Sequence, residues 1–115
     1  MKESEINLRI KLDDKNVPEK IYWNASDKED QGEEETKSVS LNIWDQLNSN
    51  TLRIDLWTKD MPVDEMKRFY VDCLGGLAQS MLSATGDEYM TNEMNELCEK
   101  FVKHIEKENK ENPPG

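Results

Sequence analysis

The sequence contains little of what most enzymes and metal sites require. Its 115 residues include one histidine, two cysteines and five glycines. His104 lies among charged residues near the end of a helical pattern, so we interpret it as a surface residue that interacts with the helix C-terminus. The spacings of the common serine, zinc and phosphate-binding motifs are also missing. We therefore expect no catalytic residue, no metal site and no cofactor, and we predict that the protein is not an enzyme.

Long apolar runs and paired cysteines are scarce as well. No run approaches the ~18 apolar residues that a membrane helix needs, and the first residues, MKESEINLRI, contain no apolar signal region. Cys73 and Cys98 lie in helical patterns without the spacing of metal ligands. We interpret them as small buried hydrophobic residues, with a disulfide as the alternative. These features predict a cytoplasmic protein that does not insert into membranes.

Basic residues are outnumbered by acidic ones. The chain has 15 lysines and arginines against 25 aspartates and glutamates, which gives a formal net charge of −10. Because phosphate binding needs clustered lysine and arginine, this balance argues against nucleic acid or an anionic membrane as a partner. It favours solubility and basic or apolar partners. The length predicts a single domain over residues 1–115.

Alternating apolar residues predict four strands in the first half of the chain. The predicted strands are residues 5–12, 19–25, 38–44 and 51–58. In the last of them, Leu52, Ile54 and Leu56 alternate with charged residues. Short connections and half-polar faces indicate an antiparallel sheet with one face on the core.

The connection between the second and third predicted strands is strongly acidic. Residues 27–37, DKEDQGEEETK, contain six acidic and two basic residues and no apolar side chain. We predict a mobile, solvated loop. A cation site is the alternative, although the oxygen spacing of a calcium loop is missing.

After Pro62 the apolar period changes to three or four, which predicts two helices. The first carries an apolar stripe from Met66 onward and ends near Gly86, a favourable C-terminal residue. Asp87 can cap the second helix, and the polar tail over residues 108–115 is expected to be disordered. Strands followed by helices indicate the α+β class, with both helices covering one face of a four-stranded antiparallel sheet.

Three aromatic residues fall on the predicted sheet face opposite the helices. They are Tyr22, Trp44 and Trp57, and Arg53 lies among them. Aromatic residues mixed with arginine are typical of protein interfaces. We therefore predict a surface for a partner or for self-association. The alternative is a local role, in which the tryptophans fold over the ends of a hairpin.

Gly75 and Gly76 are adjacent inside the first predicted helix. Each glycine costs a helix interior ~1 kcal/mol relative to alanine. Small residues let a second helix approach closely, either from the same chain or from another subunit. The alternative is a tolerated bend in the helix.

Three segments resemble the gliding motility protein GldC family of gliding Bacteroidota: VPEKIYWNA (17–25), LRIDLWTKDMPVDEMKRFY (52–70) and GDEYM (86–90). The resemblance implies a cytoplasmic, non-catalytic accessory protein of gliding motility and the linked type IX secretion machinery. It implies a protein-binding or adaptor module whose partners are other motility or secretion proteins, or further copies of itself. It offers no catalytic or ligand-binding residue.

The predicted order of elements is similar to that of the export chaperone SecB, in which subunits associate and apolar surface holds unfolded clients. This likeness of architecture implies an alternative function as a holding chaperone for exported proteins. A small-ligand carrier with a pocket between sheet and helices is a third hypothesis.

Overall fold

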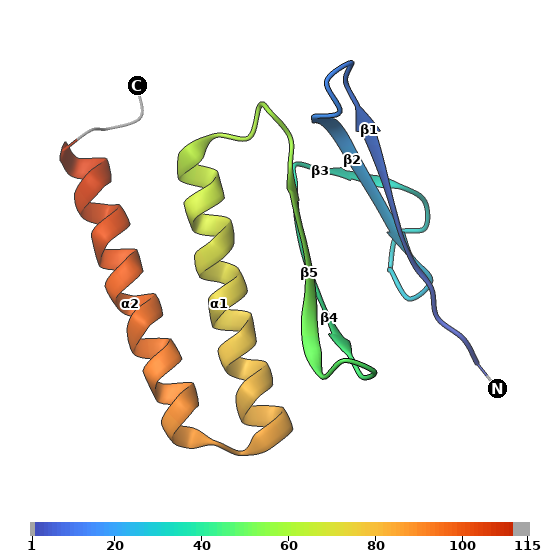
Figure 1. Cartoon of the computed structure of the whole chain (residues 1–115). Coiled ribbons are helices and arrows are strands. Elements are labelled where there is room, and N and C mark those ends of the chain that lie inside the picture. Colours follow the sequence, from blue (N-terminus) through green and yellow to red (C-terminus); the bar gives the residue numbers. More distant parts are fainter. Residues whose placement is uncertain (1, 112–115) are drawn as a thin grey trace. The chain divides into compact units, whose positions relative to one another are not determined.

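The computed structural model describes residues 2–111, which form five strands and two helices (Figure 1). The elements in chain order are β1 (Ile6–Leu12), β2 (Pro18–Ala25), β3 (Glu34–Thr36), β4 (Ser38–Asp45), β5 (Asn50–Trp57), α1 (Val63–Thr85) and α2 (Glu88–Glu111). The chain divides into two compact units, Met1–Pro62 with the strands and Val63–Gly115 with the helices. This organisation confirms the predicted α+β class.

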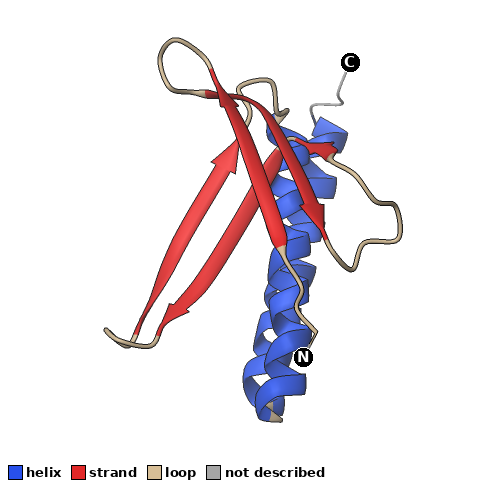
Figure 2. Cartoon of the chain, turned by 90° about the vertical axis from the view of Figure 1, so that its right-hand side faces the viewer, coloured by secondary structure: helices blue, strands red, loops and turns tan. Residues whose placement is uncertain are grey.

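The first sheet is antiparallel, with the strand order β1-β2-β3 (strands in red in Figure 2). Leu8 pairs with Trp23 and Ile10 with Ile21, so the apolar residues of β1 and β2 share one face of this sheet. Ile21 also pairs with Thr36 of β3 and is completely buried. This side chain is therefore the best-packed apolar residue of the strand unit.

The second sheet is the β4–β5 hairpin, which is antiparallel and two-stranded. One of its faces carries three aliphatic pairs, which we name the aliphatic ladder: Val39–Leu56, Leu41–Ile54 and Ile43–Leu52. At the turn, the Asp45 carboxylate accepts hydrogen bonds from the backbone N–H groups of Leu47 and Asn48. Ser49 then adopts a φ of 53°, which reverses the chain into β5.

The predicted single four-stranded sheet is wrong, because the strands form two sheets and the chain passes from one to the other at Lys37, between β3 and β4. Residues Glu34–Thr36 pair with β2, whereas Ser38 and its successors pair with β5. Continued pairing with β2 would reach Pro18, which has no N–H to donate. The carbonyl of Lys37 instead accepts a 2.9 Å hydrogen bond from Thr58, so the chain leaves one sheet and enters the other.

The acidic connection is tied to the first sheet. Glu33 forms a 3.0 Å ion pair with Arg9, and Lys28 forms a 3.1 Å ion pair with Glu34. Gln31 donates hydrogen bonds to two backbone carbonyls of the same connection. The segment predicted as a mobile loop therefore contains β3 and two ion pairs, which its composition did not reveal.

The helix boundaries follow the predicted signals. α1 begins directly after Pro62, and Gly86 adopts a φ of 72° just past its end, a conformation that glycine allows without strain. Asp87 Oδ1 accepts a 3.0 Å hydrogen bond from the N–H of Met90 and so caps α2. α2 continues to Glu111, so residues 108–111 of the tail predicted to be disordered are helical; residues 112–115 lie outside the described part.

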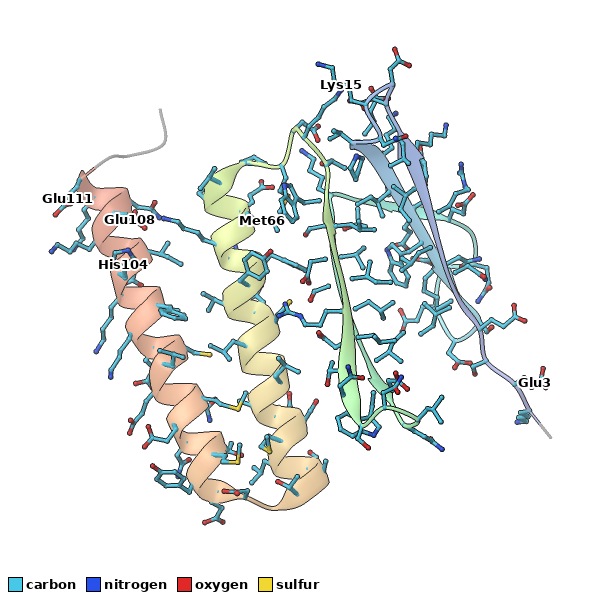
Figure 3. All side chains as sticks on the ribbon, viewed as in Figure 1. Glu3, Lys15, Met66, His104, Glu108 and Glu111 are labelled. Atoms are coloured by element: carbon cyan, nitrogen blue, oxygen red, sulfur yellow. The ribbon has the colours of Figure 1, made fainter. Side chains whose placement is uncertain are left out.

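The two helices form an antiparallel hairpin. Ala78 of α1 and Thr91 of α2 are buried, and Lys67 Nζ donates a 2.8 Å hydrogen bond to Glu108 (α2, Figure 3). Neither helix is long and apolar enough to cross a membrane, as judged over residues 2–111. The covering of a sheet face by these helices stays a prediction.

The ion pair between Lys67 and Glu108 makes the stability of the helix hairpin depend on pH. The hydrogen bond from Lys67 holds the pKa of Glu108 below its ordinary value. A lowered folded-state pKa stabilises the fold above the unfolded pKa, and this contribution is lost as the pH falls through the folded pKa. We expect Glu108→Gln to lower the melting temperature slightly at pH 7, with a difference from the wild type that disappears in acid. Thermal unfolding of both proteins between pH 7 and pH 3 measures this; a constant difference would contradict it.

Candidate protein-binding site

The candidate site is the face of the β4–β5 hairpin opposite the aliphatic ladder. We name it the tryptophan face, and it consists of Ser38, Ser40, Asn42 and Trp44 on β4 and of Thr51, Arg53, Asp55 and Trp57 on β5. Trp44 is 63% exposed and Trp57 is 50% exposed. The register confirms the predicted placement of both tryptophans opposite the aliphatic residues, and their exposure makes them accessible to a partner.

Each tryptophan stands at one end of the face, on a different strand, beside a small residue. Trp44 pairs across the strands with Thr51, and Trp57 pairs with Ser38. The two intervening rows are polar. The face therefore has two aromatic ends on diagonally opposite corners and a hydrogen-bonding centre.

The centre of the tryptophan face is organised around Asp55. Its Oδ1 accepts a 2.8 Å hydrogen bond from Ser40, and its Oδ2 accepts a 3.0 Å hydrogen bond from Arg53 Nη2. The Arg53 side chain is 59% exposed. Because a guanidinium has ~5 N–H donors, Arg53 retains donors for a group outside this hairpin.

Tyr22 does not join the tryptophan face. It lies on β2 in the other sheet, opposite Glu35, and the Arg9 guanidinium lies 4.5 Å from its ring centre. Lys11 also approaches the ring, at 5.6 Å. The hydrogen bond between Arg9 and Glu33 raises the pKa of Arg9. The guanidinium is charged at ordinary pH, so it can form a cation–π contact with the Tyr22 ring. Tyr22 is thus engaged by its own sheet, and the prediction that grouped it with the tryptophans is not supported by the geometry.

The two glycines of α1 also differ from the expectation of a close helix contact. A Cβ atom added at Gly75 or Gly76 would meet no heavy atom within 4 Å. The described part of the chain therefore places no second backbone against them, and α2 packs on another side of α1. A contact with a second subunit at these glycines stays a prediction.

Two features of the structure were not identified from the sequence. The ammonium of Lys28 lies 4.9 Å from the ring centre of Trp23, and its side chain is only 9% exposed. Nothing in the acidic segment distinguished this lysine. The second feature is a groove of about 220 Å³ between the helices, lined by Lys67, Tyr70, Val71, Phe101, His104 and Ile105. Tyr70 and Phe101 belong to stripes that the helical period assigned to the core.

The chemistry of the remaining groups is that of a protein surface. His104 is exposed and lies 3.4 Å from Glu108, one turn further along α2 (Figure 3), which confirms its interpretation as a surface residue. Within residues 2–111 the side chains of histidine, cysteine, aspartate and glutamate form no cluster of three that would hold a metal ion.

Comparison with protein families gives one match. The family model described as gliding motility-associated protein GldC-like matches residues 18–107 of the chain. This region contains β2 to β5 and α1 completely, and therefore the whole tryptophan face. Comparisons with curated proteins and with solved structures find no match.

Proposed function

The chain belongs to the GldC-like family of gliding motility-associated proteins, and from this premise we propose that it acts as a protein-binding module. In this proposal it is a non-catalytic, cytoplasmic accessory protein that serves gliding motility and the linked type IX secretion machinery. Its partners are other proteins of these systems. The tryptophan face of the β4–β5 hairpin is the surface that binds them.

The observation that carries the proposal is the two-sided character of this hairpin. The aliphatic ladder covers one face, and Ile43 and Ile54 on it are about half exposed. The tryptophan face covers the other. A two-stranded hairpin is at best marginally stable alone in water, so one of its faces needs a packing partner. A layer packed on the aliphatic ladder would leave the tryptophans on the opposite face accessible. The indoles are therefore available to a partner protein.

The composition of the face fits protein recognition. Tryptophan and arginine are the residues most enriched among those that dominate binding energies at interfaces. Here two exposed indoles flank Arg53, which is held by Asp55 at 3.0 Å. The ion pair limits the freedom of the arginine before binding, which reduces the entropy lost when a partner docks.

The test is capture of partners from a lysate of gliding bacteria. We expect the double variant Trp44→Ala/Trp57→Ala to retain the fold. We expect it to capture at least about tenfold less of the motility or secretion proteins than the wild type, because buried interface tryptophans typically contribute ~2 kcal/mol or more to binding. Tyr89→Ala is the matched control, since Tyr89 is a 75% exposed aromatic residue on α2, outside the tryptophan face. Quantitative mass spectrometry of the captured proteins measures the result. Equal capture by the double variant and the wild type would refute the assignment of the site.

A holding chaperone for exported proteins is the second candidate function. It is favoured by exposed apolar residues beyond the tryptophan face, such as Leu77 on α1 and Leu97 on α2, which are 51% and 41% exposed. A holding chaperone would slow the aggregation of an unfolded client when present in excess, whereas an adaptor would leave light scattering by the client unchanged.

A further inference from the structure

We propose that two copies of this chain bind each other face to face through their tryptophan faces, related by a twofold axis. The inference rests on the proposed function, because it names a second copy as one partner of the same site. It is argued from the register of β4 and β5, which fixes where each side chain of the face lies.

The large and small residues of the face have the positions that such an axis requires. The twofold axis lies in the plane between the two copies and is perpendicular to the strands. It places β4 over β4 and β5 over β5 of the second copy, with the two chains running in opposite directions. Trp44 then lies over Ser38 of the second copy, and Trp57 lies over Thr51 of the second copy. Each bulky indole therefore meets a small side chain, either the exposed Thr51 or Ser38, which is 9% exposed within its own chain, and the two sheets can approach to the ~10 Å of ordinary sheet packing.

The charges of the face obey the same symmetry. The axis crosses β5 between Arg53 and Asp55, so the arginine of each copy lies over the aspartate of the other. The same axis places Asn42 of each copy over Ser40 of the other copy, so these two side chains can form a hydrogen bond at both symmetry-related positions. Every contact is made twice in an interface of this kind. Arg53 and Asp55 therefore form two intermolecular ion pairs at the centre of the interface, and the tryptophans lie at its two ends.

The electrical neutrality of the face also favours a second copy. The chain carries a formal net charge of −10, so two copies repel each other over most of their surface. The tryptophan face has one cation and one anion, Arg53 and Asp55, and no net charge. A self-association surface on this protein needs such a neutral region, and the aromatic ends supply the apolar area.

Reversal of single charges tests the contact. In Arg53→Asp, two aspartates of one copy face two of the other, and in Asp55→Arg two arginines face two arginines. We expect wild type to form a dimer of about 27 kDa, twice the 13.4 kDa of the chain. We expect each single variant to dimerise at least about 100-fold more weakly, because juxtaposed like charges cost several kcal/mol in an interface. Sedimentation equilibrium or mass photometry measures both.

The decisive measurement mixes the two variants. One copy with aspartate at both positions and one with arginine at both positions make two favourable contacts, so the equimolar mixture is expected to form a heterodimer. The Arg53–Asp55 ion pair within each hairpin is absent from both variants, before and after mixing. Its loss therefore cannot explain a recovery of dimerisation in the mixture. Exposed ion pairs of this type contribute little to folding, and circular dichroism verifies that both variants are folded. Lys103→Asp, on α2, is the matched charge reversal outside the face and is expected to remain dimeric.

The outcomes separate the dimer from the proposed function. A monomeric wild type, single variants that dimerise like wild type, or a mixture that stays monomeric would each overturn the dimer. If the wild type is monomeric and Trp44→Ala/Trp57→Ala still loses captured proteins, the dimer fails and the proposed function stands. Heterodimer formation with unchanged capture by the tryptophan variant supports the dimer and refutes binding of other proteins at this face.

Discussion

Replacement of Ala78 by aspartate is expected to unfold the helix hairpin at room temperature. Ala78 is completely buried in α1, so the variant would place a carboxylate where no water reaches it. Burial of an unpaired charge costs ~3–5 kcal/mol even after local relaxation. The free energy of unfolding of a small domain is ~5–15 kcal/mol. Ala78→Asp is therefore expected to remove most of the free energy of unfolding of this small helix hairpin. Urea titration followed by the helical circular dichroism signal measures the loss.

The neighbouring position supplies the control for this substitution. Gln79→Asp introduces the same side chain one residue further along α1, where the side chain is exposed. Its cost is expected to stay below ~0.7 kcal/mol, the scale of helix propensity. Equal urea midpoints for the two variants would show that burial of Ala78 does not stabilise the helix pair.

Replacement of Ile21 by alanine is expected to destabilise the strand unit by ~2–5 kcal/mol, the usual range for a buried isoleucine. Ile21 is 0% exposed and lies in the middle of the first sheet, between Ile10 and Thr36. The deletion leaves a cavity among residues that strand pairing holds in place. Because Ile21 and Ala78 are the only fully buried apolar side chains among residues 2–111, few other contacts compensate.

Ile54→Ala is the control for Ile21→Ala. Ile54 is 48% exposed on the aliphatic ladder, so the same truncation removes less buried area. We expect a cost of about 1 kcal/mol, roughly half the transfer energy of a buried aliphatic side chain. Denaturant unfolding followed by tryptophan emission compares the two variants, and a larger loss for Ile54→Ala would contradict the assigned packing.

Most element boundaries could be predicted because their causes are local. Alternation with a period of two identified β1, β2, β4 and β5, and Pro62, Gly86 and Asp87 marked the ends of the helices. The short strand β3 was missed because Glu34 to Thr36 carry no apolar alternation. Their strand conformation comes from pairing with β2, a contact between distant residues that composition does not encode.

The candidate site was also predicted only where the cause is local to a strand. Strand parity placed Trp44, Trp57 and Arg53 on one face, because successive side chains of a strand must point in opposite directions. Parity also assigned Tyr22 to that face, since a single sheet was assumed. The chain passes from the first sheet to the second at Lys37, between β3 and β4, which separates Tyr22 from the tryptophans; the cation over the Tyr22 ring could not be inferred from spacing.

The topology has a consequence for synthesis of the chain. Each element pairs with a neighbour along the sequence: β1 with β2, β2 with β3, β4 with β5, and α1 with α2. Such local pairings close rapidly because little loop entropy is lost. The strands can therefore form as they leave the ribosome, whereas the helices follow Val63 and take about 3–10 s longer to be translated, at ~5–20 residues per second. During this interval the strand unit can fold by itself, before the helix hairpin has been synthesised.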